Sequence, residues 1–218
     1  MVPNTRDETA EGLIALPPEV RIALAYAPAS ASAAWRGLFQ FDSQLARIAL
    51  SPRDAMLTQL KLAWWRDACA LRAQARQHPV LAALGESWRG APAALVALVD
   101  AWEELAVADG EFAAAAQTVA RQRAVVLARA AGAEPASAHD ATLVWTLVAL
   151  AAHAPGAEQA AAMRAQARRL PRRPMPRALR PLAVLDGLAR RALAADRALL
   201  LGDRLSPLAA MRLGIFGR

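Results

Sequence analysis

Prolines divide this sequence into segments that indicate α-helices, and this punctuation constrains the fold more than any other feature. Pro18, Pro52, Pro79 and Pro92 each stand near the start of an alanine- and leucine-rich segment. A proline fits the first turn of a helix, where its missing N–H is not needed. Alanine and leucine favour helix over strand, and no segment shows the alternation of a strand. The sequence therefore predicts an all-α fold.

The expected helices follow from these start and stop signals. Ser51 and Asp54 around Pro52 predict a capped start for the helix that contains both adjacent tryptophans. The proline-rich stretch 171–177 predicts a stiff linker. The helices are expected at about 17–27, 30–50, 51–77, 79–88, 92–107, 110–131, 137–152, 157–170, 176–195 and 207–213.

Length and composition indicate one domain without a membrane span. The 218 residues are 56% apolar, enough for a single core; we expect a flexible segment over 1–17 and a helical domain over 18–218. The polar N-terminus does not resemble a signal peptide, and no uncharged apolar run is long enough to cross a bilayer. Cys69, the single cysteine, indicates a reducing compartment and a cytoplasmic protein, with the thiol buried as a small apolar group.

Two adjacent tryptophans mark the helix over 51–77. Leu57, Leu60 and Trp64 recur at helical spacing with Ala68 and Leu71, which predicts a stripe facing the core. Trp65 lies about 100° away on the same helix. Two alternatives explain it: a helix buried on two sides, or a cavity wall.

The charge is concentrated near the C-terminus. The net charge is +7, and residues 164–218 hold thirteen arginines against three aspartates. The segment Arg168–Arg180 is either a solvated linker or a patch for an anionic membrane surface. Nucleic-acid binding is not expected, because aromatic residues are not interleaved with the arginines. The three histidines lack partners at metal-ligand spacing and are expected to cap helices or lie on the surface.

An ordered set of segments resembles the squalene/phytoene synthase family. These segments are "LALAYAP", "AAWRGLFQFDSQLARI", "QLKLAWWRDA", "HPVLAAL", "ALVDAWEELA", "ALRPLAVLDGLARRAL" and "MRLGIFGR", and they span about 21–218. The resemblance implies a single-domain isoprenoid-synthase-like helix bundle around a deep apolar cavity for prenyl chains. It also implies two aspartate-rich motifs that hold Mg²⁺ ions and a diphosphate, because ionising an allylic diphosphate requires neutralising the leaving group.

The implied aspartate motifs are incomplete. Asp42 occupies the first position of the D-x-x-x-D pattern, but Ala46 stands where the second aspartate belongs. The segment 139–153 offers Asp140 and no further carboxylate before Glu158. Asp100 and Glu104 share a helix face, with Glu103 beside them; this cluster is either a solvated surface or a remnant of metal binding. The resemblance therefore implies a degenerate member, a pseudoenzyme of terpenoid biosynthesis.

The resemblance also implies roles for individual side chains. Asp42, Asp100 and Glu104 are the candidate metal or diphosphate ligands, with Mg²⁺ as the cofactor if the protein is active. Arg36 and Arg66 are candidate rim residues, and Arg66 is expected to reach an acidic group such as Asp42. The candidate cavity lining is Tyr26, Phe39, Trp65 and Trp145.

Two functional hypotheses remain. The first is a non-catalytic protein that binds an isoprenoid or other apolar ligand, peripheral to the inner membrane, or that acts on a partner protein as an assembly factor, as motif-poor mitochondrial relatives do for respiratory complex I. The second is an active Mg²⁺-dependent prenyltransferase with an altered diphosphate site.

Overall fold

The protein is all-α in the computed structural model, which describes residues 14–51, 54–71, 78–108, 110–201, 211–212 and 214. No strand occurs in these residues. The α-helices are α1 Pro18–Leu24, α2 Ser32–Ala49, α3 Ala55–Leu71, α4 Pro79–Ser87, α5 Pro92–Ala106, α6 Phe112–Ala130, α7 Pro135–Ala151, α8 Ala157–Arg169 and α9 Arg180–Ala194, with short 3₁₀ turns before α2 and α9.

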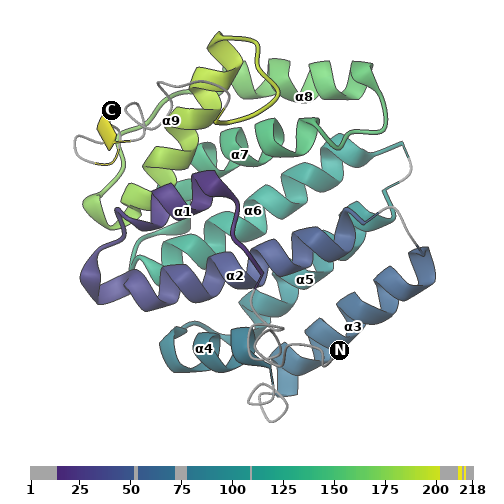
Figure 1. The fold of residues 1–218 in the computed structure, drawn as a ribbon, viewed down its shortest axis with the longest axis vertical. Coiled ribbons are helices and arrows are strands. Elements are labelled where there is room, and N and C mark those ends of the chain that lie inside the picture. The colour runs from purple at the N-terminus through teal and green to yellow at the C-terminus, as the bar shows by residue number, and fades with distance from the viewer. Residues whose placement is uncertain are drawn as a thin grey trace, which may run out of the picture.

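Helix α7 lies at the centre of the upper half of the molecule (Figure 1). It is apolar on every side, and its residues 141–148 are all buried. Helices α6, α8 and α9 pack around it. Helices α3 and α4 lie at the lower end of the molecule in Figure 1, where α3 packs mainly on α5 and α4 packs on α2.

Most of the expected helix limits are confirmed, and the differences have local causes. The cap of α3 is Asp54, whose carboxylate accepts hydrogen bonds from the backbone N–H groups of Met56 and Leu57 at 2.9 and 3.3 Å, rather than Ser51. Helix α7 begins two residues before Ser137, because Pro135 occupies its first turn. Gly132 ends α6 with a φ of +64°, a conformation that glycine adopts without strain.

Three expectations fall on residues outside the described ranges. They are the flexible N-terminal segment up to residue 13, the continuation of α3 over 72–77 and most of the last helix, over 207–213. Within the described residues, no helix is long and apolar enough to cross a membrane.

Most of the predicted core stripe of α3 is wrong, although Ala68 is buried as expected. Leu57, Leu60 and Trp64 are 46%, 63% and 42% exposed, whereas Leu62 and Trp65 are buried. The helix is apolar over a wide arc, and the arc that contains Leu62 and Trp65 is the one that faces the bundle, where α3 packs on α5 and α2. The sequence-based prediction assigned the longer apolar stripe to the core, but its residues Leu57, Leu60 and Trp64 face solvent.

Candidate functional site

A buried ion pair lies where the resemblance places the first metal ligand. Arg123 of α6 binds both carboxylate oxygens of Asp42 on α2, through Nε to Oδ1 at 3.0 Å and Nη2 to Oδ2 at 2.9 Å. The indole N–H of Trp102 on α5 donates to the same Oδ1 at 2.9 Å. Both charged side chains are nearly inaccessible, at 7% and 10% exposure for Arg123 and Asp42. The carboxylate is therefore held by three donors from two other helices.

The guanidinium of Arg123 is satisfied on its other sides as well. Its Nη1 donates to the hydroxyl of Thr146 on α7 at 3.0 Å. Its central carbon lies 4.4 Å from the ring centre of Trp145 and 4.9 Å from that of Trp102, within range of a cation–π interaction. A buried charge pair is stable only when its remaining donors and acceptors also find partners, and this network meets that condition.

Sequence reasoning missed Arg123, although a signal was present. Ala116, Val119, Ala120 and Leu127 are buried positions of α6 at helical spacing, and Arg123 occupies the same face. An arginine at a core position requires an acidic partner. Asp42 lies on the buried face of α2 with Leu38, Phe41 and Leu45, which makes it a candidate partner.

The ion pair borders a cavity of about 880 Å³ that is open to solvent, which we call the central cavity. Its wall is contributed by α1, α2, α5, α6 and α7 and by the segment 198–200. Trp145, predicted as a lining residue, lies in this wall together with Trp102. Arg47, Glu19 and His153 supply polar groups to the same wall. The cavity is thus mixed in character, with an internally neutralised charge pair beside indole rings.

The other predicted lining residues lie elsewhere. Phe39 is buried in the core, 5.4 Å from Trp35 and 6.1 Å from Trp145 between ring centres. Trp65 packs on Phe41, with ring centres 5.6 Å apart. Tyr26 is half-buried, and its ring lies against Gly214, where an added methyl group would approach to 2.2 Å.

The remaining acidic candidates are not gathered around Asp42. Arg66 binds Asp100 at 2.6 Å and also pairs with Glu103, so it does not reach Asp42 as expected. Glu104 is exposed and accepts a hydrogen bond from Thr118 at 3.4 Å. Within the described residues, no group of three or more histidine, cysteine or acidic side chains could hold a metal ion.

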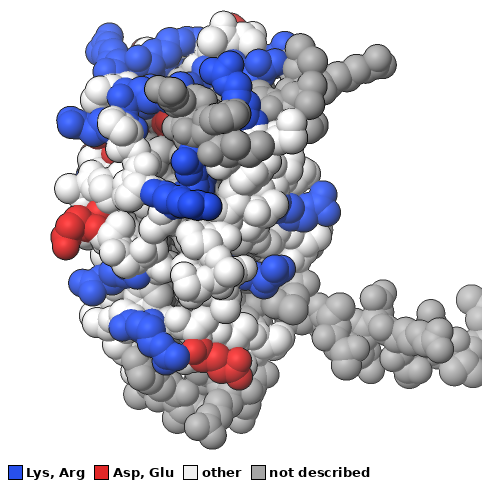
Figure 2. Space-filling model, turned by 90° about the vertical axis from the view of Figure 1, so that its left-hand side faces the viewer, with Lys and Arg blue, Asp and Glu red and all other residues white. Residues whose placement is uncertain are grey.

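The arginines near the C-terminus divide into two groups. Some hold the structure together: Arg164 and Arg168 bind Asp196, and Arg173 binds Asp140. Asp186 is buried and paired with Arg190 at 2.9 Å; burial raises the pKa of its carboxyl group, and Arg190 opposes that effect. Arg169, Arg172 and Arg177 are exposed. Figure 2 shows basic side chains gathered at the top of the molecule.

Arg36, the other candidate rim residue, is distant from these groups. It lines a separate groove of about 690 Å³ between α2 and α4, together with Arg89 and Arg129. The groove shares no lining residue with the central cavity. The structure therefore does not place Arg36 beside Asp42.

No protein-family model, curated protein or solved structure matches this chain.

Proposed function

We propose that this protein is a squalene/phytoene synthase-like helix bundle that no longer transfers prenyl groups and binds an isoprenoid or other apolar ligand in its central cavity. The observation that carries the proposal is the occupation of Asp42 by Arg123 and Trp102. A magnesium ion would need lone pairs of this carboxylate, and each of its oxygens already accepts hydrogen bonds from within the bundle.

Exchanging the guanidinium for a metal ion is unfavourable. Arginine remains charged at every physiological pH, so releasing it from Asp42 would leave a buried cation beside an incoming divalent cation. Breaking such a pair costs about 3–5 kcal/mol. The free energy of binding Mg²⁺ to a single carboxylate would not offset that cost. Mg²⁺-dependent ionisation of a diphosphate requires several converging ligands.

The cavity itself supports binding of an apolar ligand. Its volume of about 880 Å³ falls in the usual range for small-molecule sites. Trp102 and Trp145 supply indole surface, and Ala46, Leu50 and Leu150 supply aliphatic surface. A prenyl chain or a similar hydrocarbon matches this wall better than a free diphosphate does.

The test compares farnesol with farnesyl diphosphate, each with and without Mg²⁺. We expect farnesol to quench tryptophan fluorescence or give a calorimetric binding signal that Mg²⁺ does not change, and no pyrophosphate release from the diphosphate. Mg²⁺-dependent pyrophosphate release that disappears in Asp42→Asn would establish the altered prenyltransferase instead. Absence of farnesol binding would contradict the proposal that the central cavity binds an apolar ligand.

A second candidate function, a protein-assembly factor, is favoured by the exposed face of α3. Met56, Leu57, Leu60 and Trp64 are 71%, 46%, 63% and 42% exposed, and contiguous apolar patches of this kind often mark interaction surfaces. This function predicts a stoichiometric partner that co-purifies with the protein and is lost in Leu60→Gln/Trp64→Gln. Farnesol binding by that variant should be unchanged.

A further inference from the structure

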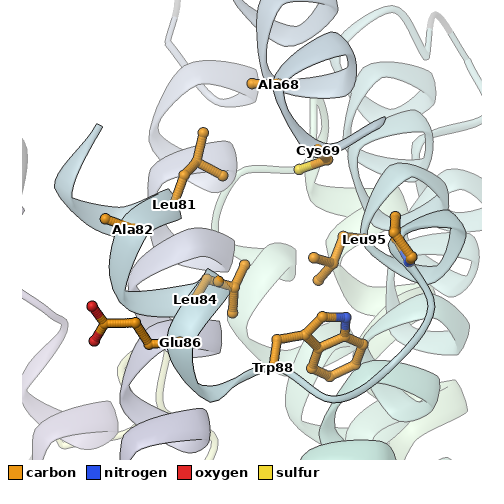
Figure 3. Close-up of a pocket in the computed structure, with 10 residues that line it drawn as sticks. Ala68, Cys69, Leu81, Ala82, Leu84, Glu86, Trp88 and Leu95 are labelled. Carbon is orange, nitrogen blue, oxygen red and sulfur yellow. The ribbon is translucent and has the colours of Figure 1, made fainter. Parts of the chain in front are cut away.

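A further cavity lies at the lower end of the bundle. It shares no lining residue with the central cavity, but it shares Glu86 and Trp88 with the groove that contains Arg36. Its volume is about 580 Å³, and α3, α4, α5 and the turn after α4 contribute its wall. Cys69, Leu81, Leu84 and Leu95 line it with Trp88, and Figure 3 shows these side chains arranged around one space. We call it the Trp88 cavity.

Among the described residues, the interior of the Trp88 cavity carries no charge at neutral pH. Burial raises the pKa of the Cys69 thiol to about 12, so the sulfur stays protonated. Glu86, the charged residue among those described in the wall, is exposed and lies at the edge of the view in Figure 3. Among these described groups a charged ligand would find no counter-ion inside, whereas an apolar one would lose little by leaving water.

One polar group inside the cavity lacks a protein partner. Trp88 is 7% exposed, and its indole Nε1 has no hydrogen-bond acceptor within the described part of the chain. In Figure 3 the nitrogen lies on the upper edge of the ring, the edge turned toward Cys69 and Leu95. A buried donor left unpaired costs about 1–3 kcal/mol, so an acceptor that enters this space recovers that free energy.

The position of the indole is fixed by its surroundings. Gly90 lies against the ring so closely that an added methyl group would approach Cζ2 to 2.2 Å. Trp88 is the C-cap of α4, and its backbone N–H donates to the Leu84 carbonyl at 2.7 Å. These contacts restrict the indole, and a restricted donor favours recognition by a directed hydrogen bond.

We propose that the Trp88 cavity is a binding site for an uncharged apolar molecule with one hydrogen-bond acceptor oxygen, a ketone, ester or ether, whose oxygen accepts the Trp88 indole N–H. The aliphatic side chains hold the hydrocarbon part of the ligand. This site is separate from the central cavity, so it does not depend on the function proposed above.

The test uses two soluble probes of the same shape, butyrophenone and butylbenzene, which differ in the carbonyl oxygen. The six tryptophans give separate indole N–H signals by NMR, and Trp88→Phe identifies that of Trp88. We expect butyrophenone to move the Trp88 signal downfield and to bind more tightly than butylbenzene. The indole signals of Trp102 and Trp145 report on the central cavity and should stay in place.

Two variants separate the hydrogen bond from packing. Trp88→Phe keeps an aromatic ring without the donor, and it should weaken butyrophenone binding about fivefold to tenfold, the effect of one neutral hydrogen bond, with butylbenzene binding unchanged. Trp35→Phe is the matched control, because the Trp35 indole N–H also lacks an acceptor within the described residues but does not line this cavity. An unmoved Trp88 signal, or the same loss of affinity for both probes in Trp88→Phe, would overturn the proposal.

Discussion

At the scale of single residues, the decisive side chain is Arg123. It joins α2, α5, α6 and α7 through Asp42, Trp102, Thr146 and Trp145. Such a network fixes the relative positions of four helices, because its buried donors and acceptors all find partners on other helices. Arg123 permanently supplies, beside Asp42, the positive charge that a bound metal ion would bring.

Removing one member of the pair should be far more costly than removing both. We expect Asp42→Ala to lower the free energy of unfolding by about 3–5 kcal/mol, because Arg123 is left as an unpaired buried cation. The double variant Asp42→Leu/Arg123→Met should recover most of the loss. Urea unfolding of the two single variants and the double variant measures the coupling. Additive losses would show that the buried pair does not act as a unit.

The N-terminal cap of α4 is a second feature that depends on a single residue. The His78 Nδ1 accepts the backbone N–H of Val80 at 3.3 Å, and the ring packs on Trp65 with centres 4.7 Å apart. Nδ1 can accept only while it is unprotonated. Burial lowers the pKa of His78 from its usual 6.5, which agrees with a neutral ring in the folded protein.

This cap predicts a dependence of stability on pH. With the pKa of folded His78 below that of the unfolded chain, the unfolded state binds the proton more readily, so stability is lost as pH falls below about 6.5 toward the lower folded value. His78→Asn keeps a capping side chain that does not titrate. Thermal melts from about pH 7 to pH 5 should show a steeper loss for the native protein than for His78→Asn. Parallel curves for both proteins would contradict the assignment.

At the scale of elements, α3 shows where pattern reasoning reaches its limit. The all-α fold and the starts of α4 and α5 could be predicted, because proline and helix-former signals are local. The buried face of α3 could not, because leucine, methionine and tryptophan occur around most of its circumference. Which arc is buried depends on where α5 lies. The position of α5 is a matter of tertiary packing, so the spacing of residues within α3 cannot predict it.

Leu60 and Leu62 provide a matched test on this helix. Leu60 is 63% exposed and Leu62 is fully buried, although they are two residues apart and chemically identical. We expect Leu60→Ala to change the free energy of unfolding by less than about 0.5 kcal/mol and Leu62→Ala to lower it by about 2–5 kcal/mol. Chemical denaturation of both variants measures the difference. A larger loss of stability for Leu60→Ala than for Leu62→Ala would show that the stripe predicted from the sequence is the core face.

At the scale of the whole molecule, the arginine-rich surface and the exposed apolar face of α3 lie at opposite ends. Helix α8, which leads into the arginine-rich segment, is at the top of Figure 1, and α3, with its exposed apolar face, is at the bottom. The sequence predicted the basic segment from arginine counts alone. It could not predict which arginines are engaged, because Asp140 and Asp196 reach Arg173, Arg164 and Arg168 from distant positions in the chain. The pair of Asp186 and Arg190, by contrast, is local, four residues apart on α9. The exposed arginines Arg169, Arg172 and Arg177 are the ones that an anionic surface outside the protein would contact.

We therefore expect the basic end to bind anionic vesicles through Arg169, Arg172 and Arg177. Each arginine near such a surface contributes about 1 kcal/mol, so changing all three to glutamine should weaken binding to phosphatidylserine-containing vesicles about 100-fold. Arg164 and Arg168 are left unchanged because they hold Asp196. Sedimentation with vesicles measures the affinity, and added salt should weaken binding of the native protein more than that of the variant. Vesicle binding that neither salt nor the triple change affects would assign the attachment to the exposed apolar face of α3, and the protein would then lie on a membrane with its arginines turned away.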